Sequence, residues 1–208
     1  MTQAFNGLRV IDTTHVLAGP FASYQMAVLG AEVIKVEHPR DPDQARAQGS
    51  DRSLNDRGMG TAFMSQAANK QALALDLKTP EGVEALRRLA ATADVFVENY
   101  RPGAFEALGL GYKDLAAINP KLVYCSISAF GANGPKREAT GYDNILQAYS
   151  GMMAMTGFGD GKPLKSGAPV VDYATGTTAA FAITAALFQR QQNGGRGQFI
   201  DVSMLDVA

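Results

Sequence analysis

Residues 7–37 read GLRVIDTTHVLAGPFASYQMAVLGAEVIKVE, in which two short apolar runs flank a segment with helix signals. Residues 8–12 and 31–37 have the length and β-branched content of buried strands. Residues 20–29 predict a helix, because Pro20 suits a first turn and Gly30 suits a helix end. A strand, a helix and a second strand in this order predict a right-handed crossover between parallel strands.

The alternation of strands and helices continues along the chain. Thr79 and Pro80 open a second predicted helix, with a capping residue followed by proline at the first helical position. A long apolar helix is predicted over 172–192. Residues 38–66 are polar without a clear period and predict an irregular surface segment, while LGLG at 108–111 predicts a turn. Further strands are predicted at residues 72–77, 94–98, 122–128 and from 197 onward. The expected fold class is therefore α/β, a Rossmann-like and mainly parallel sheet with helices on both faces.

Composition excludes several classes of protein. The 208 residues are 46 % hydrophobic and 19 % charged, which is typical of a globular chain with a substantial core. The formal net charge of −1 provides no global attraction for nucleic acid or an anionic membrane, and neither is expected as a partner. The single cysteine, Cys125, lies in an apolar run and predicts a packing residue rather than a disulfide. His15 and His38 stand apart, so no metal site is expected.

Targeting signals are not evident at the start of the sequence. Residues 1–16 lack the basic flank and apolar centre of a signal or transit peptide. No uninterrupted apolar stretch approaches the roughly 20 residues that span a bilayer. A cytoplasmic location is therefore expected. Because the sequence stops at Ala208 just after a predicted strand, residues 1–208 are expected to form an incomplete large domain.

The first segment that can carry chemistry is KSGAPVVDYATG at 165–176, which places Asp172 where the long helix begins. The helix dipole and free backbone N–H groups at such a position favour the ionised carboxylate. An ionised carboxylate beside a ligand-admitting loop can act as a nucleophile. The same position also suits an ordinary helix-capping aspartate, so both interpretations stay open at this point.

Two further loops are candidates for ligand binding. Residues 13–20, TTHVLAGP, join the first strand to the first helix at the carboxyl edge, where open α/β sheets bind ligands. In residues 97–103, VENYRPG, Asn99 offers amide hydrogen bonds, Tyr100 a stacking face and Arg101 a charge for phosphate. The alternatives are that residues 13–20 form a plain strand-to-helix turn and that residues 97–103 form a solvated loop. The sequence contains neither a G-x-G-x-x-G fingerprint after the first strand nor a P-loop.

Taken together, eight stretches in the same order resemble the class III coenzyme A transferases, the CaiB/BaiF type. This family includes formyl-CoA transferase, dicarboxylate CoA-transferases, carnitine CoA-transferase and α-methylacyl-CoA racemase. The stretches are GLRVIDTTHVLAGPFAS, LGAEVIKVE, NKQALALDLKTPEG, ADVFVENYRPGAFEALGLGY, YCSISAFGANGP, GYDNILQAYSGMMAMTG, SGAPVVDYATG and GRGQFIDVSMLD.

The resemblance implies a role for Asp172 as the nucleophile that attacks an acyl-CoA thioester and carries a covalent intermediate. It implies that coenzyme A and acyl-CoA are substrates and that neither a metal nor a prosthetic group is needed. Positions matching the family's CoA site are His15, Val16, Leu17, Ala18, His38, Leu75, Lys78, Asn99, Tyr100, Arg101 and Tyr142. At the position of His38 some relatives have arginine, so Arg40 is a second candidate for binding phosphate.

The resemblance also suggests what lies outside these motifs. It implies a second domain and a C-terminal return beyond residue 208, and an interlocked homodimer of the full-length protein. The expected activity is CoA transfer, from a donor such as succinyl-CoA, to a small carboxylic acid. A 2-methylacyl-CoA racemase and a catalytically incomplete CoA-binding fragment are the alternatives. Tyr142 stands where racemases have histidine, and tyrosine, with a reference pKa near 10, is a poor base at neutral pH.

Overall fold

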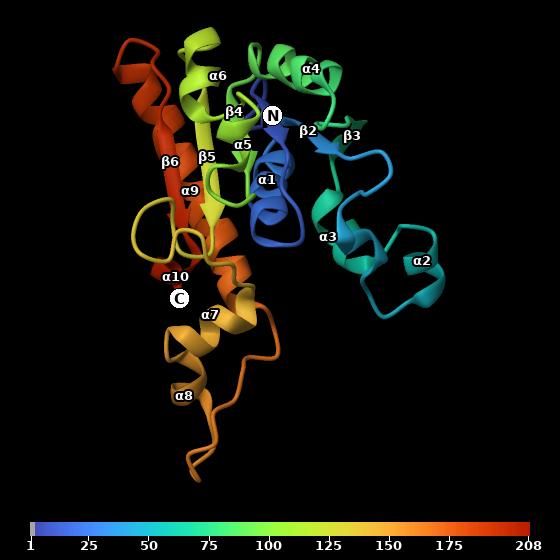
Figure 1. Ribbon diagram of the computed structural model, residues 1–208, viewed down its shortest axis with the longest axis vertical. Helices are drawn as coiled ribbons and strands as arrows, with labels where there is room; N and C mark the ends of the chain where they lie inside the picture. The colour runs from blue at the N-terminus through green and yellow to red at the C-terminus, as the bar shows by residue number, and fades with distance from the viewer. Residues whose placement is uncertain (1–2) are drawn as a thin grey trace.

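The computed structural model describes residues 3–208 and is built on a six-stranded sheet in which every neighbouring pair of strands is parallel (Figure 1). The strand order is β3-β2-β1-β4-β5-β6, so the order reverses between β1 and β4. The predicted α/β, Rossmann-like fold is confirmed. The strands are β1 (Arg9–Asp12), β2 (Glu32–Glu37), β3 (Lys70–Ala74), β4 (Val95–Glu98), β5 (Val123–Ser128) and β6 (Phe199–Ser203).

Helices cover both faces of this sheet, as alternation of buried side chains along parallel strands requires. Val10 of β1 belongs to a core cluster with residues of α1 and α9, whereas the next residue, Ile11, belongs to a second cluster with residues of α4, α5 and α6. The helices are α1 (Ala18–Val28), α2 (Arg52–Asp56), α3 (Thr61–Ala67), α4 (Pro80–Ala90), α5 (Ala104–Ala107), α6 (Tyr112–Ile118), α7 (Asp143–Tyr149), α8 (Met152–Thr156), α9 (Val170–Gln192) and α10 (Met204–Val207).

Aromatic and sulfur-containing side chains fill the middle of the core. Phe96 and Tyr124 stack with ring centroids 5.1 Å apart on the face that α4 to α6 cover. Cys125 points to the other face, is fully buried, and burial raises the pKa of its thiol far above the usual range. The prediction that Cys125 is a packing residue is confirmed.

The long helix α9 lies against α1, and Gly176 sets their approach. A Cβ atom on Gly176 would stand 2.6 Å from the Ala18 carbonyl oxygen, so only glycine fits there without a shift. With 23 residues and a mean hydropathy of 1.2 in its most apolar window, α9 could cross a membrane by length and composition alone. Its buried residues, including Ala179 and Ile183, pack into the core beside α1, as those of a core helix in a globular domain do.

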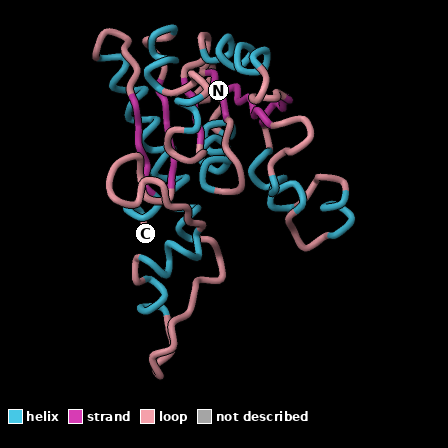
Figure 2. Tube along the Cα trace, in the orientation of Figure 1, coloured by secondary structure: helices cyan, strands magenta, loops and turns pink. Residues whose placement is uncertain are grey.

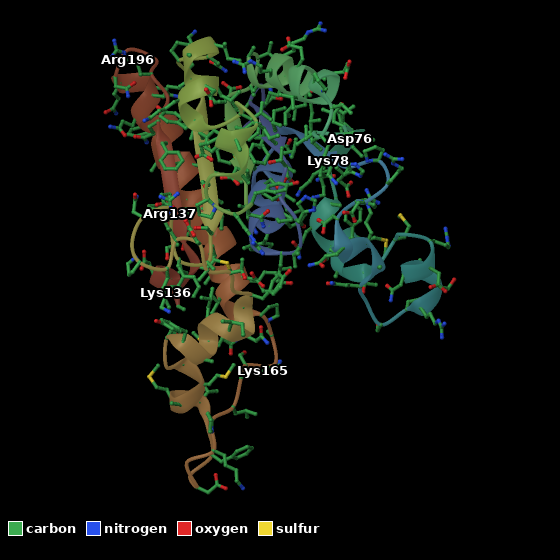
Figure 3. The ribbon with its side chains drawn as sticks, viewed as in Figure 1. Asp76, Lys78, Lys136, Arg137, Lys165 and Arg196 are labelled. Carbon is green, nitrogen blue, oxygen red and sulfur yellow. The ribbon has the colours of Figure 1, made fainter. Side chains whose placement is uncertain are left out.

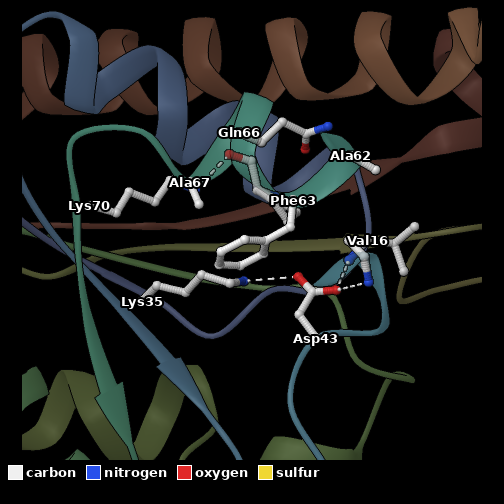
Figure 4. Close-up of a pocket in the computed structure, with 10 residues that line it drawn as sticks. Val16, Lys35, Asp43, Ala62, Phe63, Gln66, Ala67 and Lys70 are labelled. Atoms are coloured by element: carbon white, nitrogen blue, oxygen red, sulfur yellow. Dashed lines mark hydrogen bonds and ion pairs between the residues drawn. The ribbon is translucent and has the colours of Figure 1, made fainter. Parts of the chain in front are cut away.

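The segment 38–66 lies largely at the surface, as predicted, but it is not irregular throughout. It contains a 3₁₀ turn (Gln44–Ala47), α2 and most of α3, and it buries Asp43 and Gln66. Asp43 is buried because its carboxylate pairs with buried Lys35 at 3.1 Å and accepts hydrogen bonds from the backbone N–H groups of Val16 and Ala45, both at 3.0 Å (Figure 4). Most residues of the segment are exposed, so its polarity reflects exposure to solvent together with a few specific buried partners.

Strand β3 begins two residues earlier than predicted, at Lys70. Its ammonium group is buried and pairs with the Asp12 carboxylate at 2.9 Å, and it donates hydrogen bonds to Ser23 Oγ and the Pro20 carbonyl oxygen, both at 2.8 Å. Despite the cost of burial, Lys70 and Lys35 hold the pKa of Asp12 well below its usual range. One buried charge thus ties β1, α1 and β3 together.

Candidate active site

The loops that follow β1 and β4 meet where the strand order reverses, the place where open α/β sheets bind ligands. The backbone N–H of His15 donates to Asn99 Oδ1 and Asn99 Nδ2 donates to the His15 carbonyl oxygen, both at 2.9 Å. His15 Nε2 and the Tyr100 hydroxyl lie 2.6 Å apart. Burial lowers the pKa of His15 and raises the pKa of Tyr100 to about 12, so the pair is neutral at pH 7. The two loops predicted to bind ligand are thus joined by direct hydrogen bonds.

Beneath these loops lies a cavity of about 520 Å³, named here the switch-point cavity. It brings together most of the residues that the sequence singles out. Those lining it are His15, Val16, Leu17, Ala18, Asn99, Tyr100, Arg101, Tyr142 and Asp172. Side chains from four separate parts of the chain therefore share one cavity.

A second cavity, of about 330 Å³, adjoins the first and is named here the side cavity. His15 and Tyr100 border both cavities, and the remaining predicted residues, His38, Leu75 and Lys78, line the side cavity. Lys78 is exposed at the end of the segment that follows β3, where Figure 3 labels it next to Asp76. All eleven residues predicted to contact CoA thus border one of two adjoining cavities.

His38 is held from both sides. Its Nδ1 accepts hydrogen bonds from the backbone N–H groups of Arg40 and Asp41, at 3.2 and 3.0 Å, and its Nε2 lies 3.3 Å from Asp76 Oδ1. The Arg40 guanidinium is 4.0 Å from the same carboxylate and largely exposed. Arg40 thus remains accessible to a phosphate, whereas both nitrogens of His38 already have partners.

Asp172 lies in the first turn of α9, two residues after the helix begins at Val170. The prediction that it could be the capping residue is wrong. Asp143, at the start of α7, performs that role: its Oδ2 accepts from the backbone N–H groups of Val171 at 2.7 Å and of Asp172 at 3.0 Å. In residues 3–208, no hydrogen bond involves the carboxylate oxygens of Asp172.

Asp143 is itself firmly positioned. Its other oxygen, Oδ1, accepts a hydrogen bond from Gln147 Nε2, and Gln147 Oε1 accepts from the Ser166 backbone N–H at 2.8 Å. These bonds fix the segment leading into α9 against α7, which projects with α8 past the carboxyl edge of the sheet (Figure 2). Asp143 and Gln147 were not singled out from the sequence, although Asp143 directly follows Tyr142 in the motif GYDN.

The charge state of Asp172 differs from the expectation. Burial, and secondly the nearby Asp143 carboxylate, raise the pKa of Asp172 to about 7. The expected stabilisation of the ionised form fails because burial disfavours the charge, and because Asp143 takes the N–H groups at the helix start and adds a like charge. The pKa of Asp172 therefore lies well above that of an ordinary aspartate.

A third cavity, of about 440 Å³, lies between α3 and the segment leading into α9 and is named here the α3–α7 cavity. Val16, Leu17, Tyr142 and Asp172 line both this cavity and the switch-point cavity. Asp172 therefore stands at the junction of two separate spaces. Sequence reasoning did not single out further polar residues of the α3–α7 cavity, among them Gln66 and Lys165, which lie in segments without a periodic pattern.

Glu98, at the carboxyl end of β4, is a further buried acid that the sequence did not identify. It is 5 % exposed, and its carboxylate accepts a hydrogen bond from the Tyr100 backbone N–H at 2.8 Å. Burial raises the pKa of Glu98 to about 7. It supports the loop that carries Asn99 and Tyr100. Among residues 3–208 no group of three or more His, Cys, Asp or Glu side chains is arranged to hold a metal ion.

Comparison with known proteins gives a consistent assignment. Residues 5–208 match the family described as CoA-transferase family III. The succinyl-CoA:glutarate CoA-transferase of Mus musculus is 46 % identical over 96 % of this chain and 45 % of its own length, and the formyl-CoA:oxalate CoA-transferase of Streptomyces avermitilis is 43 % identical over 98 % and 48 %. The crystal structure of a CAIB/BAIF family protein from Brucella suis superposes with a TM-score of 0.93 at 39 % identity, covering 100 % of this chain and 55 % of that one. The chain thus spans about half the length of the curated relatives it matches.

Proposed function

The chain belongs to CoA-transferase family III, and on this premise we propose that it carries the nucleophile and the CoA site of an enzyme that transfers CoA from an acyl-CoA to a small carboxylic acid. The observation that supports this most strongly is the position of Asp172. Its carboxylate, without a hydrogen bond to residues 3–208, lies at the junction of the switch-point and α3–α7 cavities. A thioester lying across that junction presents its carbonyl carbon to the carboxylate.

The first half of the reaction transfers the donor's acyl group and then CoA to the enzyme. The ionised Asp172 attacks the thioester carbonyl carbon, the C–S bond breaks, and CoA leaves as a thiolate while a mixed anhydride forms. The thiolate then attacks the Asp172 side-chain carbonyl. The donor acid departs as a carboxylate and Asp172 is left as a CoA thioester.

The second half repeats these steps in reverse order with the acceptor. The acceptor carboxylate attacks the carbonyl carbon of the Asp172 thioester and releases the CoA thiolate, forming a new anhydride. The thiolate attacks the acceptor's acyl carbon, so the new acyl-CoA leaves and the Asp172 carboxylate is regenerated. Each step exchanges one activated acyl bond for another, and no electrons are gained or lost.

CoA is proposed to lie along the switch-point and side cavities. The two cavities are continuous in their lining at His15 and Tyr100, which suits a long ligand with a pantetheine arm and a nucleotide. Arg101 and Lys78 are exposed cations at the two cavities, where they can bind phosphate groups. The Asp172 end of the switch-point cavity then receives the thioester.

The substrates are proposed to be small acids, with a dicarboxyl-CoA such as succinyl-CoA as the donor. Relatives named for succinyl-CoA with glutarate and for formyl-CoA with oxalate support acids of this size. Tyr142 borders the switch-point and α3–α7 cavities with Asp172, and it carries a phenol where racemases of the family have the imidazole of a histidine. This favours transfer over racemisation.

We also propose that the full-length protein is a cytoplasmic homodimer. The exposed face of α9 supports an interface, because Phe181 and Phe188 are 74 % and 62 % exposed there. Mass measurement of the full-length protein in solution tests this assignment, and a monomer would contradict it.

Replacement of the nucleophile tests the proposed chemistry directly. In Asp172→Asn the carboxylate nucleophile is absent, so we expect CoA transfer to fall by at least about 10³-fold. Hydroxylamine should trap an activated Asp172 in the wild-type protein incubated with succinyl-CoA, read as a mass shift on the peptide that contains it. Asp160→Asn, on an exposed loop, is the matched control. Full activity of Asp172→Asn would refute the proposal.

A further inference from the structure

We propose that Gln147 is a positioning residue for the reaction: by anchoring Asp143 and Ser166, its amide keeps the Asp172 carboxylate free to attack a thioester. This inference rests on the proposed role of Asp172 as the nucleophile. It adds a buried side chain that lines neither the switch-point cavity nor the α3–α7 cavity and acts on the reaction through Asp143.

Gln147 is buried in α7, and both ends of its amide have a partner. The residue is 1 % exposed. Its Nε2 donates to Asp143 Oδ1, four residues earlier on the same helix, and its Oε1 accepts from the Ser166 backbone N–H at 2.8 Å. The amide therefore joins α7 to the segment that leads into α9, beyond the carboxyl edge of the sheet (Figure 1). Only a side chain with both a donor and an acceptor can make this link.

The N–H groups at the start of α9 are occupied without any contribution from the Asp172 side chain. Asp143 Oδ2 accepts from the N–H groups of Val171 and Asp172. The N–H groups on either side of these two, at residues 170 and 173, donate to backbone carbonyl oxygens. The first four N–H groups of a helix have no partner within the helix, and here each has one outside its regular pattern. The Asp172 carboxylate is thus left to line both cavities.

This occupation depends on the orientation of Asp143, which Gln147 fixes. Without the amide, Asp143 Oδ1 loses its donor and the Ser166 N–H loses its acceptor, both in a buried place, so Asp143 is no longer held in one orientation. The N–H groups that it releases are then open to Asp172, an acid in the first turn of the helix. A carboxylate that accepts such hydrogen bonds is stabilised as the anion and turned back toward the helix.

The charged and titratable groups around Asp172 come from several elements. Besides Asp143, those that line the two cavities with it are His15, Tyr100, Arg101, Tyr142, Lys165 and Tyr173. All of these groups stay in place when Gln147 is replaced, whereas the hydrogen bonds of Asp143 change. A shift in the titration of Asp172 in such a variant therefore reports on Asp143.

The experiment follows the hydroxylamine-trapped Asp172 adduct in the full-length polypeptide. Its rate of formation from succinyl-CoA is measured between pH 5 and 9 in the wild type and in Gln147→Leu, because leucine fills the space without a donor or acceptor. We expect the plateau rate to fall about tenfold. The midpoint of the pH profile should move to lower pH by about half a unit or more.

Gln147→Glu is the conservative variant that should restore the rate. Burial and the nearby Asp143 charge favour the protonated form of the new carboxyl group, which can donate to Asp143 and accept from Ser166. At pH 7 we expect its rate to lie within about threefold of the wild-type rate. Leu146→Val is the matched control, since Leu146 is the buried neighbour of Gln147 on α7 and its shortening leaves the hydrogen bonds of the amide in place. It should lower the urea midpoint without moving the pH midpoint.

The outcomes separate this inference from the proposed function. If the wild type forms the adduct and Gln147→Leu keeps both the wild-type plateau and the wild-type pH midpoint, the inference is overturned while the proposed function stands. If no adduct forms in the wild type, the proposed function itself fails. Should Gln147→Leu not fold, Gln147→Asn decides the question in the same way, because its amide is one carbon shorter and cannot span from Asp143 to Ser166.

Discussion

Asp143 determines what Asp172 can do. By accepting the N–H groups of Val171 and Asp172, it satisfies the start of α9 and leaves the Asp172 carboxylate without a partner in residues 3–208. Burial, and secondly the negative charge of Asp143, raise the pKa of Asp172 to about 7. A nucleophile with free lone pairs and a pKa close to the working pH is the result.

This arrangement predicts a pH dependence for adduct formation. The ionised form of Asp172 attacks the thioester, so the rate should rise with pH through about 7 and level off above it. In Asp143→Asn the like charge is removed, which lowers the pKa of Asp172 and moves the midpoint to lower pH. The rate of hydroxylamine-trapped adduct between pH 5 and 9 measures both. An unchanged midpoint in Asp143→Asn would contradict the role given to Asp143.

At the scale of elements, the approach of α9 to α1 connects packing to the site. Gly176 allows α9 to lie against the start of α1, and Asp172 is one turn earlier on the same helix. The loop preceding α1 contains His15 and Val16, which line the switch-point cavity. The contact between the two helices therefore fixes the nucleophile relative to the CoA loop.

Gly176→Ala tests this contact. Alanine favours a helix over glycine by about 1 kcal/mol, yet the added Cβ would meet the Ala18 carbonyl oxygen at 2.6 Å. Because overpacking against backbone costs about 1–3 kcal/mol, we expect a net loss of stability by urea unfolding, accompanied by slower adduct formation. Gly159→Ala is the control, since its Cβ would meet no atom within 4 Å. A stabilised Gly176→Ala variant would show that the helices separate without strain.

At the scale of the whole molecule, buried acids give folding a pH dependence. The pKa of Glu98 rises from about 4.5 to about 7 on folding, because burial disfavours its charged form. Between these two values the folded protein binds more protons than the unfolded chain, so stability falls as pH rises.

The loss from Glu98 is complete once pH exceeds about 7 and amounts to roughly 3 kcal/mol. Glu98→Gln replaces the acid with an amide that does not titrate. The slope of the unfolding free energy against pH between about 5 and 7 should therefore be smaller. Asp172 contributes with the same sign, so a smaller slope should remain. Urea unfolding at several pH values gives both slopes, and identical slopes in variant and wild type would disprove this assignment.

Sequence patterns predict the frame of this molecule because its signals are local. The apolar runs at β1 and β2 and the Thr79 cap of α4, which accepts from the Gly82 N–H at 3.1 Å, act within a few residues. The parts that were missed depend on distant partners. The burial of Lys70 depends on its ion pair with Asp12, which lies 58 residues away in the sequence. Asp143 caps a helix 28 residues later in the chain. Gln66 is buried without a side-chain hydrogen-bond partner among residues 3–208, which no local pattern predicts.

The backbone conformation of Val16 bears on whether water can reach the proposed active site. Val16 borders both the switch-point and α3–α7 cavities and has a φ of 69°, a left-handed conformation that costs a β-branched residue about 1–3 kcal/mol. The Asp43 carboxylate, which pairs with Lys35, accepts a hydrogen bond from the Val16 N–H at 3.0 Å and so maintains this strained conformation. Neutralising Asp43 would let the loop relax and admit water to the junction at Asp172. The expected symptom is hydrolysis: acyl-CoA consumed with no acceptor present.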